Sequence, residues 1–149
     1  MDKESGLDSS AYRVELSKYR FERAQKTLEI SKRDCKYGDF NESASRSYYA
    51  IFYALLAVNE LEGFESAKHS GVISHFTLTY LKTEVFDRKL SKLIDPAFKL
   101  RRNADYEEFY FVSEDDARSQ IEDAEEIIST IRPYLESRWA EMSETQQRE

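Results

Sequence analysis

A polar segment in the last third of the chain, residues 100–106 (LRRNADY), contains side chains that can bind an anion. Arg101 and Arg102 are adjacent, and Tyr106 follows Arg101 by five positions. A guanidinium pairs with carboxylate or phosphate oxygens through two parallel hydrogen bonds. In an unbroken helix, side chains five positions apart are about 140° away from a common face, so Arg101 and Tyr106 converge only if the helix ends or bends there.

Another arginine, Arg46, precedes an aromatic run on the segment that we expect to be the most buried. Tyr48, Tyr49, Phe52 and Tyr53 follow it closely. A buried guanidinium needs a carboxylate, a carbonyl oxygen or a ligand as its partner. A buried ion pair is the simplest expectation for Arg46, and contact with a ligand is the alternative.

The chain contains two histidines, His69 and His75, and a single cysteine, Cys35. The histidines are six positions apart and do not share a helix face, and no cysteine pair is present, so the sequence predicts no metal site and no cofactor. Cys35 lies at the end of an apolar stripe and is expected to be a small buried side chain. His69 lies near a predicted helix start, where it either stays neutral beside the positive end of the helix or bonds the backbone there.

Charge is distributed unevenly along the 149 residues, which carry a net charge of −7. Residues 1–102 contain 18 Lys and Arg against 15 Asp and Glu, whereas residues 103–149 contain 4 against 14. The negative total argues against a generally basic nucleic-acid coat, but residues 88–102 form a local basic patch around the single acid Asp95. Either a solvated helix face or a binding face would account for this patch, which comprises Arg88, Lys89, Lys92, Lys99, Arg101 and Arg102.

Composition and length favour one folded helical domain. Hydrophobic residues make up 40% and charged residues 34% of the chain, which excludes a disordered protein and a membrane-embedded one. Four glycines and two prolines are too few for turn-rich β folds. The single cysteine and the absence of an apolar leader at the N-terminus predict a cytoplasmic protein with no membrane association.

Apolar periodicity predicts four long helices and one shorter piece. A first helix over residues 10–36 and a last helix that starts after Ser113 have the clearest stripes. Gly38 and a capping box of Asp39 and Glu42 separate the first helix from the second, whose apolar run over residues 48–58 is too short to cross a membrane. The two stripes consist of Val14, Phe21, Ala24, Leu28 and Cys35, and of Ala117, Ile121, Ala124, Ile128, Ile131 and Leu135.

The remaining helices follow from weaker signals. A third helix is expected from His69 to about residue 81, and a fourth from about residue 87, in which Pro96 either kinks one helix or starts another. The predicted fold is all-α: an antiparallel up-and-down four-helix bundle with an additional short helix over residues 10–138. Residues 1–9 are expected to be a flexible N-terminus, and residues 139–149 a frayed C-terminal tail.

Three segments, in order, resemble the HEPN domain family (higher eukaryotes and prokaryotes nucleotide-binding), in particular its small stand-alone prokaryotic members. The segments are residues 46–54 (RSYYAIFYA), 68–73 (KHSGVI) and 100–106 (LRRNADY), and the resemblance covers about residues 12–137. It implies a helical bundle, usually a homodimer, that is often encoded beside a small nucleotidyltransferase as a toxin and antitoxin pair. Many such proteins are metal-independent ribonucleases whose Arg-x4-6-His signature lies across the dimer cleft.

The resemblance places the signature arginine on Arg101 and the signature histidine on Tyr106. Tyrosine, with an ordinary pKa near ~10, is a poor general base at neutral pH. Tyr106 is therefore expected to orient a phosphate or a 2′-hydroxyl while Arg101 neutralises phosphate charge, and His69 is a candidate for the missing base. The positions expected to bind substrate are Arg46, Lys99, Arg102 and Asp105. In related systems the nucleotidyltransferase adds AMP to a tyrosine near the signature, for which Tyr106 and Tyr110 are the candidates.

Two functional hypotheses follow. The first is a homodimer that cuts RNA without metal, as the toxin-like component of a toxin and antitoxin pair. The alternative is a non-catalytic module that binds a nucleotide or docks onto a nucleotidyltransferase, for which the acidic last helix (Glu122, Asp123, Glu125 and Glu126) offers a surface. The first hypothesis requires that Arg101 is not locked against an internal carboxylate.

Overall fold

The computed structural model describes residues 4–148, with side chains described from residue 9 to residue 144. The helices are α1 (Glu4–Lys36), α2 (Phe40–Glu60), α3 (His69–Phe76), α4 (Ser91–Tyr106) and α5 (Glu114–Arg148). A π-helical turn, Thr77–Leu81, continues α3, and a 3₁₀ turn, Arg88–Leu90, leads into α4. The described residues contain no strand, so the predicted all-α bundle is confirmed.

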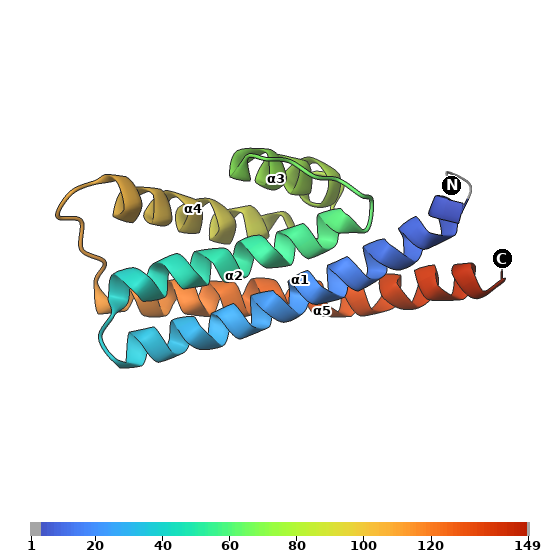
Figure 1. The fold of residues 1–149 in the computed structure, drawn as a ribbon. Coiled ribbons are helices and arrows are strands. Elements are labelled where there is room, and N and C mark those ends of the chain that lie inside the picture. Colours follow the sequence, from blue (N-terminus) through green and yellow to red (C-terminus); the bar gives the residue numbers. More distant parts are fainter. Residues whose placement is uncertain (1–3, 149) are drawn as a thin grey trace.

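Helix α2 is the central element of the bundle. Helices α1 and α2 form an antiparallel hairpin, α5 lies along both of them, and α3 and α4 cover the remaining side of α2 (Figure 1). The apolar run on α2 is accordingly buried, with Tyr48, Ile51, Leu55 and Val58 at most 1% exposed. Because α2 contacts all four other helices, a side chain on its α3–α4 side can meet groups that come from distant parts of the chain.

The two apolar stripes predicted for α1 and α5 are buried in full, as the periodicity indicated. Gly38 has a φ of +84°, the left-handed conformation that favours glycine between two helices. Ser113 caps α5, because the backbone N–H of Asp116 donates to its Oγ at 3.0 Å. The capping box predicted at Asp39 does not form. The Asp39 side chain accepts no hydrogen bond from the first turn of α2, and its ψ of 70° differs from the extended backbone usual for a capping residue.

Pro96 lies inside one continuous helix, α4, so the helix does not restart there. The exposed proline ring removes one backbone donor but lies on the side of α4 away from the core, where Ile94 and Ala97 are buried. This continuity decides how the side chains of residues 101–106 are spread around α4.

Helices α1 and α5 continue past residues 10 and 138, the boundaries expected for the bundle. Helix α5 runs to Arg148, and the ring of Trp139 packs edge-on against Phe21 while its Nε1 donates to Ser17 Oγ at 2.9 Å. Met142 also packs on the core, so the apolar stripe of α5 continues past its predicted end. The predicted flexible start and frayed end fall partly on residues 1–3 and 149, outside the described residues. No described helix has the length and apolar character needed to span a membrane.

Candidate functional site

Arg101 lies on the side of α4 that faces α2. Its side chain is 18% exposed, and its Nη2 donates a hydrogen bond to the Tyr49 hydroxyl at 3.0 Å. Its Nε lies 2.8 Å from Oδ2 of Asp105, one helical turn further along α4. The guanidinium carbon also lies 5.6 Å and 5.5 Å from the ring centres of Tyr48 and Tyr49, close enough for cation–π attraction. These contacts hold the cation in a fixed position between α4 and α2.

His69, the first residue of α3, reaches the same part of α2. Its Nδ1 lies 2.8 Å from the Tyr48 hydroxyl, and its ring stacks on Phe52 with 4.1 Å between ring centres. Burial lowers the pKa of His69 from its ordinary value, and the positive charge of Arg101 lowers it further. The sequence left two roles open for His69, a neutral imidazole beside the helix start or a bond to the backbone there; in the structure its partner is the Tyr48 hydroxyl, and burial and Arg101 lower its pKa.

Tyr48, Tyr49 and Phe52 together form the surface on which Arg101 and His69 rest, and we call these three rings the aromatic platform. The three rings contact one another with 5.2–6.5 Å between centres. Burial raises the pKa of Tyr48 far above its usual value, although Arg101 opposes the rise, so its hydroxyl keeps its proton at neutral pH. The sequence predicted that these rings belong to the core. The hydroxyl groups of Tyr48 and Tyr49 were the one signal in the sequence that these rings make polar contacts.

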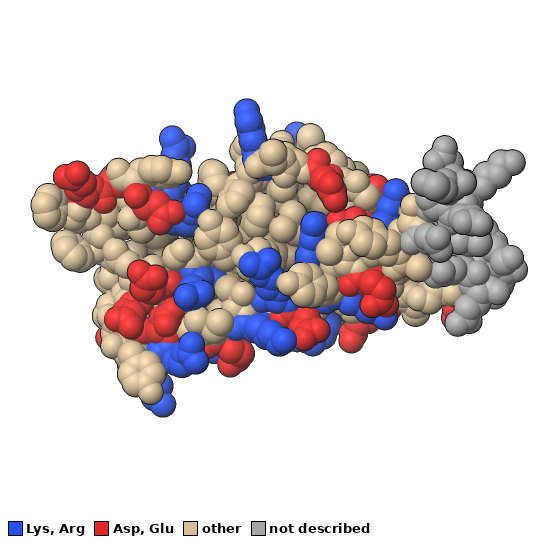
Figure 2. Space-filling model, in the orientation of Figure 1, with Lys and Arg blue, Asp and Glu red and all other residues tan. Residues whose placement is uncertain are grey.

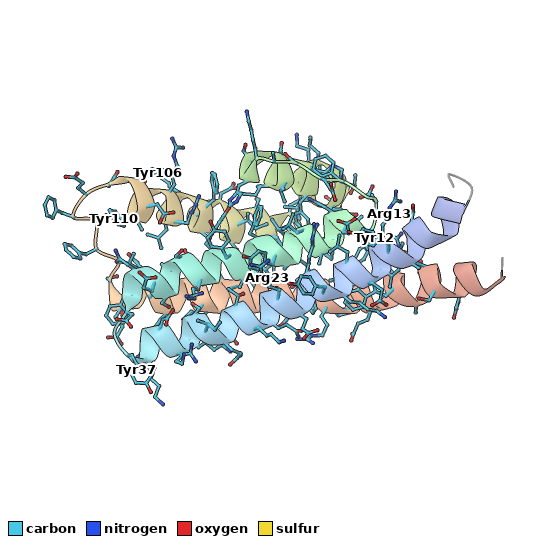
Figure 3. All side chains as sticks on the ribbon, in the orientation of Figure 1. Tyr12, Arg13, Arg23, Tyr37, Tyr106 and Tyr110 are labelled. Carbon is cyan, nitrogen blue, oxygen red and sulfur yellow. The ribbon has the colours of Figure 1, made fainter. Side chains whose placement is uncertain are left out.

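Tyr106 does not join this cluster. It is 75% exposed and lies on the outer side of α4, because the helix is unbroken from Arg101 to Tyr106 (Figure 3). Tyr106 instead lines a surface hollow with Lys99 and Arg102, together with Phe98, Asn103 and Glu107. The predicted site residues therefore form two groups: Arg101, which pairs with Asp105, lies on the same rings as His69, whereas Lys99 and Arg102 lie near Tyr106.

Arg46 is exposed, contrary to the expectation of a buried ion pair. Its side chain is 48% exposed, and its Nε lies 3.2 Å from Oδ2 of Asp34 on α1. Ser43, Ser47 and Tyr48 lie on the side of α2 that faces the core of the bundle. The helical rotation turns Arg46 away from that side. The predicted carboxylate partner exists, but the pair lies at the surface.

The surface next to α2 is rich in uncharged side chains. In Figure 2 these side chains occupy much of the middle of the visible face, with Lys and Arg side chains set among them. On this side of the bundle, the Arg23 guanidinium lies 4.4 Å from the ring centre of Tyr53. Among the described residues, no group of three or more His, Cys, Asp or Glu is arranged to hold a metal ion.

Comparison with known proteins identifies the class of protein that this bundle represents. The HEPN domain family matches residues 17–134, so the chain belongs to that family. A "UPF0332 protein" of Thermotoga maritima is 30% identical over 114 residues, which cover 76% of this chain and 86% of the relative. "Putative toxin MJ0142" of Methanocaldococcus jannaschii is 29% identical over 127 residues, covering 85% of this chain and 86% of the relative. "Putative toxin MJ0605" of the same organism is 29% identical over 96 residues, covering 64% and 71%.

Proposed function

We propose that this protein is a toxin-like HEPN ribonuclease that acts as a homodimer and cleaves RNA without a metal ion. The observation that carries the proposal is the convergence of Arg101 and His69 on the aromatic platform. When RNA is cut through its own 2′-hydroxyl, negative charge builds up on the phosphate oxygens, and a pre-positioned guanidinium stabilises that charge. Two relatives that carry the name "Putative toxin" support the toxin-like part of the proposal.

The ion pair of Arg101 with Asp105 leaves room for a phosphate. Asp105 is 38% exposed and belongs to the same helix, so it is not an internal carboxylate that locks the arginine in the core. It contacts Nε, and the Tyr49 hydroxyl accepts from Nη2, so a phosphate would bind at Nη1 and the second N–H of Nη2. Lys99, Arg102 and Tyr106 would then hold neighbouring parts of the RNA backbone on the outer side of α4.

The proposed homodimer would use the half-buried aromatic side chains of α2. Tyr49, Tyr53 and Leu56 are only partly covered by the rest of the chain, and Tyr19 on α1 is 60% exposed. Aromatic residues and arginines are enriched where proteins associate. A second subunit on this side would bring a second Arg101 toward the first and increase the positive charge available to RNA.

The test is to incubate purified protein with RNA in the presence of a chelator. The wild type should cut RNA, and Arg101→Ala should reduce the cleavage rate by about 100-fold or more, the usual effect of removing a donor to a developing oxyanion. Lys89→Ala is the matched control, because Lys89 is an exposed cation of the same basic patch on the 3₁₀ turn before α4. No cleavage by the wild type, or equal cleavage by Arg101→Ala, would exclude this function.

A second candidate is the docking module for a nucleotidyltransferase, which the exposure of Tyr106 favours. A phenol that is 75% exposed beside two cations is open to modification by a partner enzyme. Mass spectrometry after incubation with ATP and a small nucleotidyltransferase should detect AMP on the wild type but not on Tyr106→Phe. Tyr37→Phe is the control, since Tyr37 is 74% exposed in the turn between α1 and α2 and does not line the hollow that contains Tyr106. Unmodified wild-type protein would count against this candidate.

A further inference from the structure

The hydrogen bond between Tyr48 and His69 has a direction that its surroundings determine. Tyr48 is 1% exposed, and its hydroxyl lies 2.8 Å from Nδ1 of His69. Nδ1 is the hydrogen-bond partner of this hydroxyl among the described residues, and the nearby Arg101 offers only donors. If Nδ1 carried the imidazole proton, the hydroxyl hydrogen of Tyr48 would be buried without an acceptor. Tyr48 therefore donates to Nδ1.

The direction of this bond fixes the chemical character of the other ring nitrogen. A neutral imidazole carries one N–H, so a lone pair at Nδ1 places the proton on Nε2. Nε2 of His75 is buried without a hydrogen-bond partner, but Nε2 of His69 is not among the buried unpaired atoms of the described side chains. His69 is partly exposed, and its Nε2 is therefore a hydrogen-bond donor with no lone pair to accept a proton.

We infer that Tyr48 holds His69 in the Nε2–H tautomer, and that His69 and Arg101 both donate to one phosphate group, with Asp105 on the Nε side of Arg101. Both side chains rest on the aromatic platform, with the Arg101 guanidinium carbon and the His69 ring centre 5.5 Å and 5.8 Å from the centre of the Tyr49 ring. Two donors beside one another match the oxygens of a phosphodiester. The inference deepens the proposed function. It rests on that function for the identification of the phosphate as part of an RNA chain. It makes His69 a phosphate ligand instead of a general base, and Tyr48 a positioning residue.

The first test is the proton position on His69, measured by ¹⁵N NMR of the imidazole rings near pH 7.5. The chain has only two histidines, so His75→Gln assigns the signals of His69. The wild type should show a protonated Nε2 and an Nδ1 shifted by an accepted hydrogen bond. Tyr48→Phe should remove that shift of Nδ1. Tyr49→Phe, a change at the next position that removes a bond to Arg101 instead, should preserve it.

The second test is titration of the same labelled protein with inorganic phosphate and with a 2′-O-methyl RNA oligonucleotide, which cannot be cleaved through its 2′-oxygen. Both probes should move the Nε2 signal of His69, and Arg101→Ala should weaken the apparent affinity about tenfold or more. Lys89→Ala should leave the affinity nearly unchanged. A response to free phosphate alone, with none to RNA, would assign the site to a small anion and overturn the inference for RNA.

Failure of the inference and failure of the proposed function give different results. A wild-type protein that cuts RNA but carries the His69 proton on Nδ1 would overturn the inference and leave the ribonuclease in place. A protein that binds phosphate at Nε2 without cutting RNA would support the donor site and exclude the ribonuclease. If Tyr48→Phe does not fold, the wild-type tautomer and the Arg101→Ala titration still decide the outcome.

Discussion

His69 and Arg101 are held by hydrogen bonds and ring contacts that join three helices. Tyr48 binds His69, Tyr49 binds Arg101, and Asp105 lies within ion-pair distance of Arg101, whose Nε is buried without a hydrogen bond. Half-buried polar groups in such contacts lose little mobility when a ligand arrives. Pre-positioning of this kind is what transition-state stabilisation by a guanidinium requires.

The lowered pKa of His69 makes the stability of the protein depend on pH. Below the ordinary histidine pKa of about 6.5, the unfolded chain binds a proton that the folded protein does not, so the stability that His69 contributes is lost as the pH falls through this range toward the folded pKa. The difference in free energy of unfolding between wild type and His69→Gln should therefore shrink between pH 7.5 and pH 5. Urea denaturation at both values measures it, and a constant or growing difference would contradict the lowered pKa.

The ion pair between Arg20 and Glu60 should stabilise the contact between α1 and α2. Glu60 is 3% exposed and lies 2.9 Å from Arg20, and burial raises the pKa of Glu60 although Arg20 lowers it. Arg20→Ala should destabilise the protein by about 2 kcal/mol at pH 7, because it leaves a buried carboxylate without its cation. The loss should be smaller near pH 5, where Glu60 can take a proton. Lys26→Ala, at a fully exposed ion pair, should have no measurable effect on chemical denaturation.

At the scale of single helices, α4 determines which residues share a site. Its unbroken course through Pro96 turns Arg101 toward α2 and Tyr106 toward solvent. Pro96→Ala should restore a backbone hydrogen-bond donor within this helix. The unfolded chain also gains conformational freedom, which opposes the effect, so the net stabilisation should be about 1 kcal/mol. Pro133→Ala, at an exposed proline inside α5, should act in the same direction. A loss of stability in both variants, measured by thermal unfolding, would contradict this view of the helices.

The apolar stripe of α5 should carry much of the stability of the bundle. Ile131 is fully buried, so Ile131→Ala should cost about 3 kcal/mol through reduced burial and the cavity that remains. Thr130→Ala, at the exposed neighbouring position, should change the free energy of unfolding by less than about 0.5 kcal/mol. Similar losses in the two variants, measured by urea denaturation, would mean that α5 does not pack as described.

Sequence periodicity predicted the helices because each stripe needs only local spacing to be recognised, as in α1 and α5. The length of α5 was underestimated, although Trp139 and Met142 follow Leu135 at steps of four and three and continue the same stripe. The candidate site could be predicted only in part. Arg101 and His69 were recognised separately, but their convergence depends on the packing of α3 and α4 on α2, which local spacing does not encode. The exposure of Arg46 was not foreseen for a different reason: residues 48–58 are all uncharged, so the spacing did not reveal which side of α2 faces solvent.

At the scale of the whole molecule, the proposed homodimer should form through the aromatic side of α1 and α2. Sedimentation at micromolar concentration should show a dimer, and Tyr53→Arg should shift it to a monomer by placing a second cation beside Arg23. Tyr37→Arg, at an exposed tyrosine beyond the end of α1, should remain a dimer. A monomeric wild type, or a dimer that tolerates Tyr53→Arg, would exclude this interface.

The central claim is that the guanidinium of Arg101 contacts an RNA phosphate. The most direct measurement is the affinity of wild type and Arg101→Ala for a 2′-O-methyl RNA over a range of salt concentrations. Arg101→Ala should bind about tenfold more weakly, and its log–log salt slope should be less steep by about 0.7, because one cation no longer neutralises a phosphate. Lys89→Ala should keep the affinity nearly unchanged. Equal affinity and equal salt dependence for wild type and Arg101→Ala would contradict the claim.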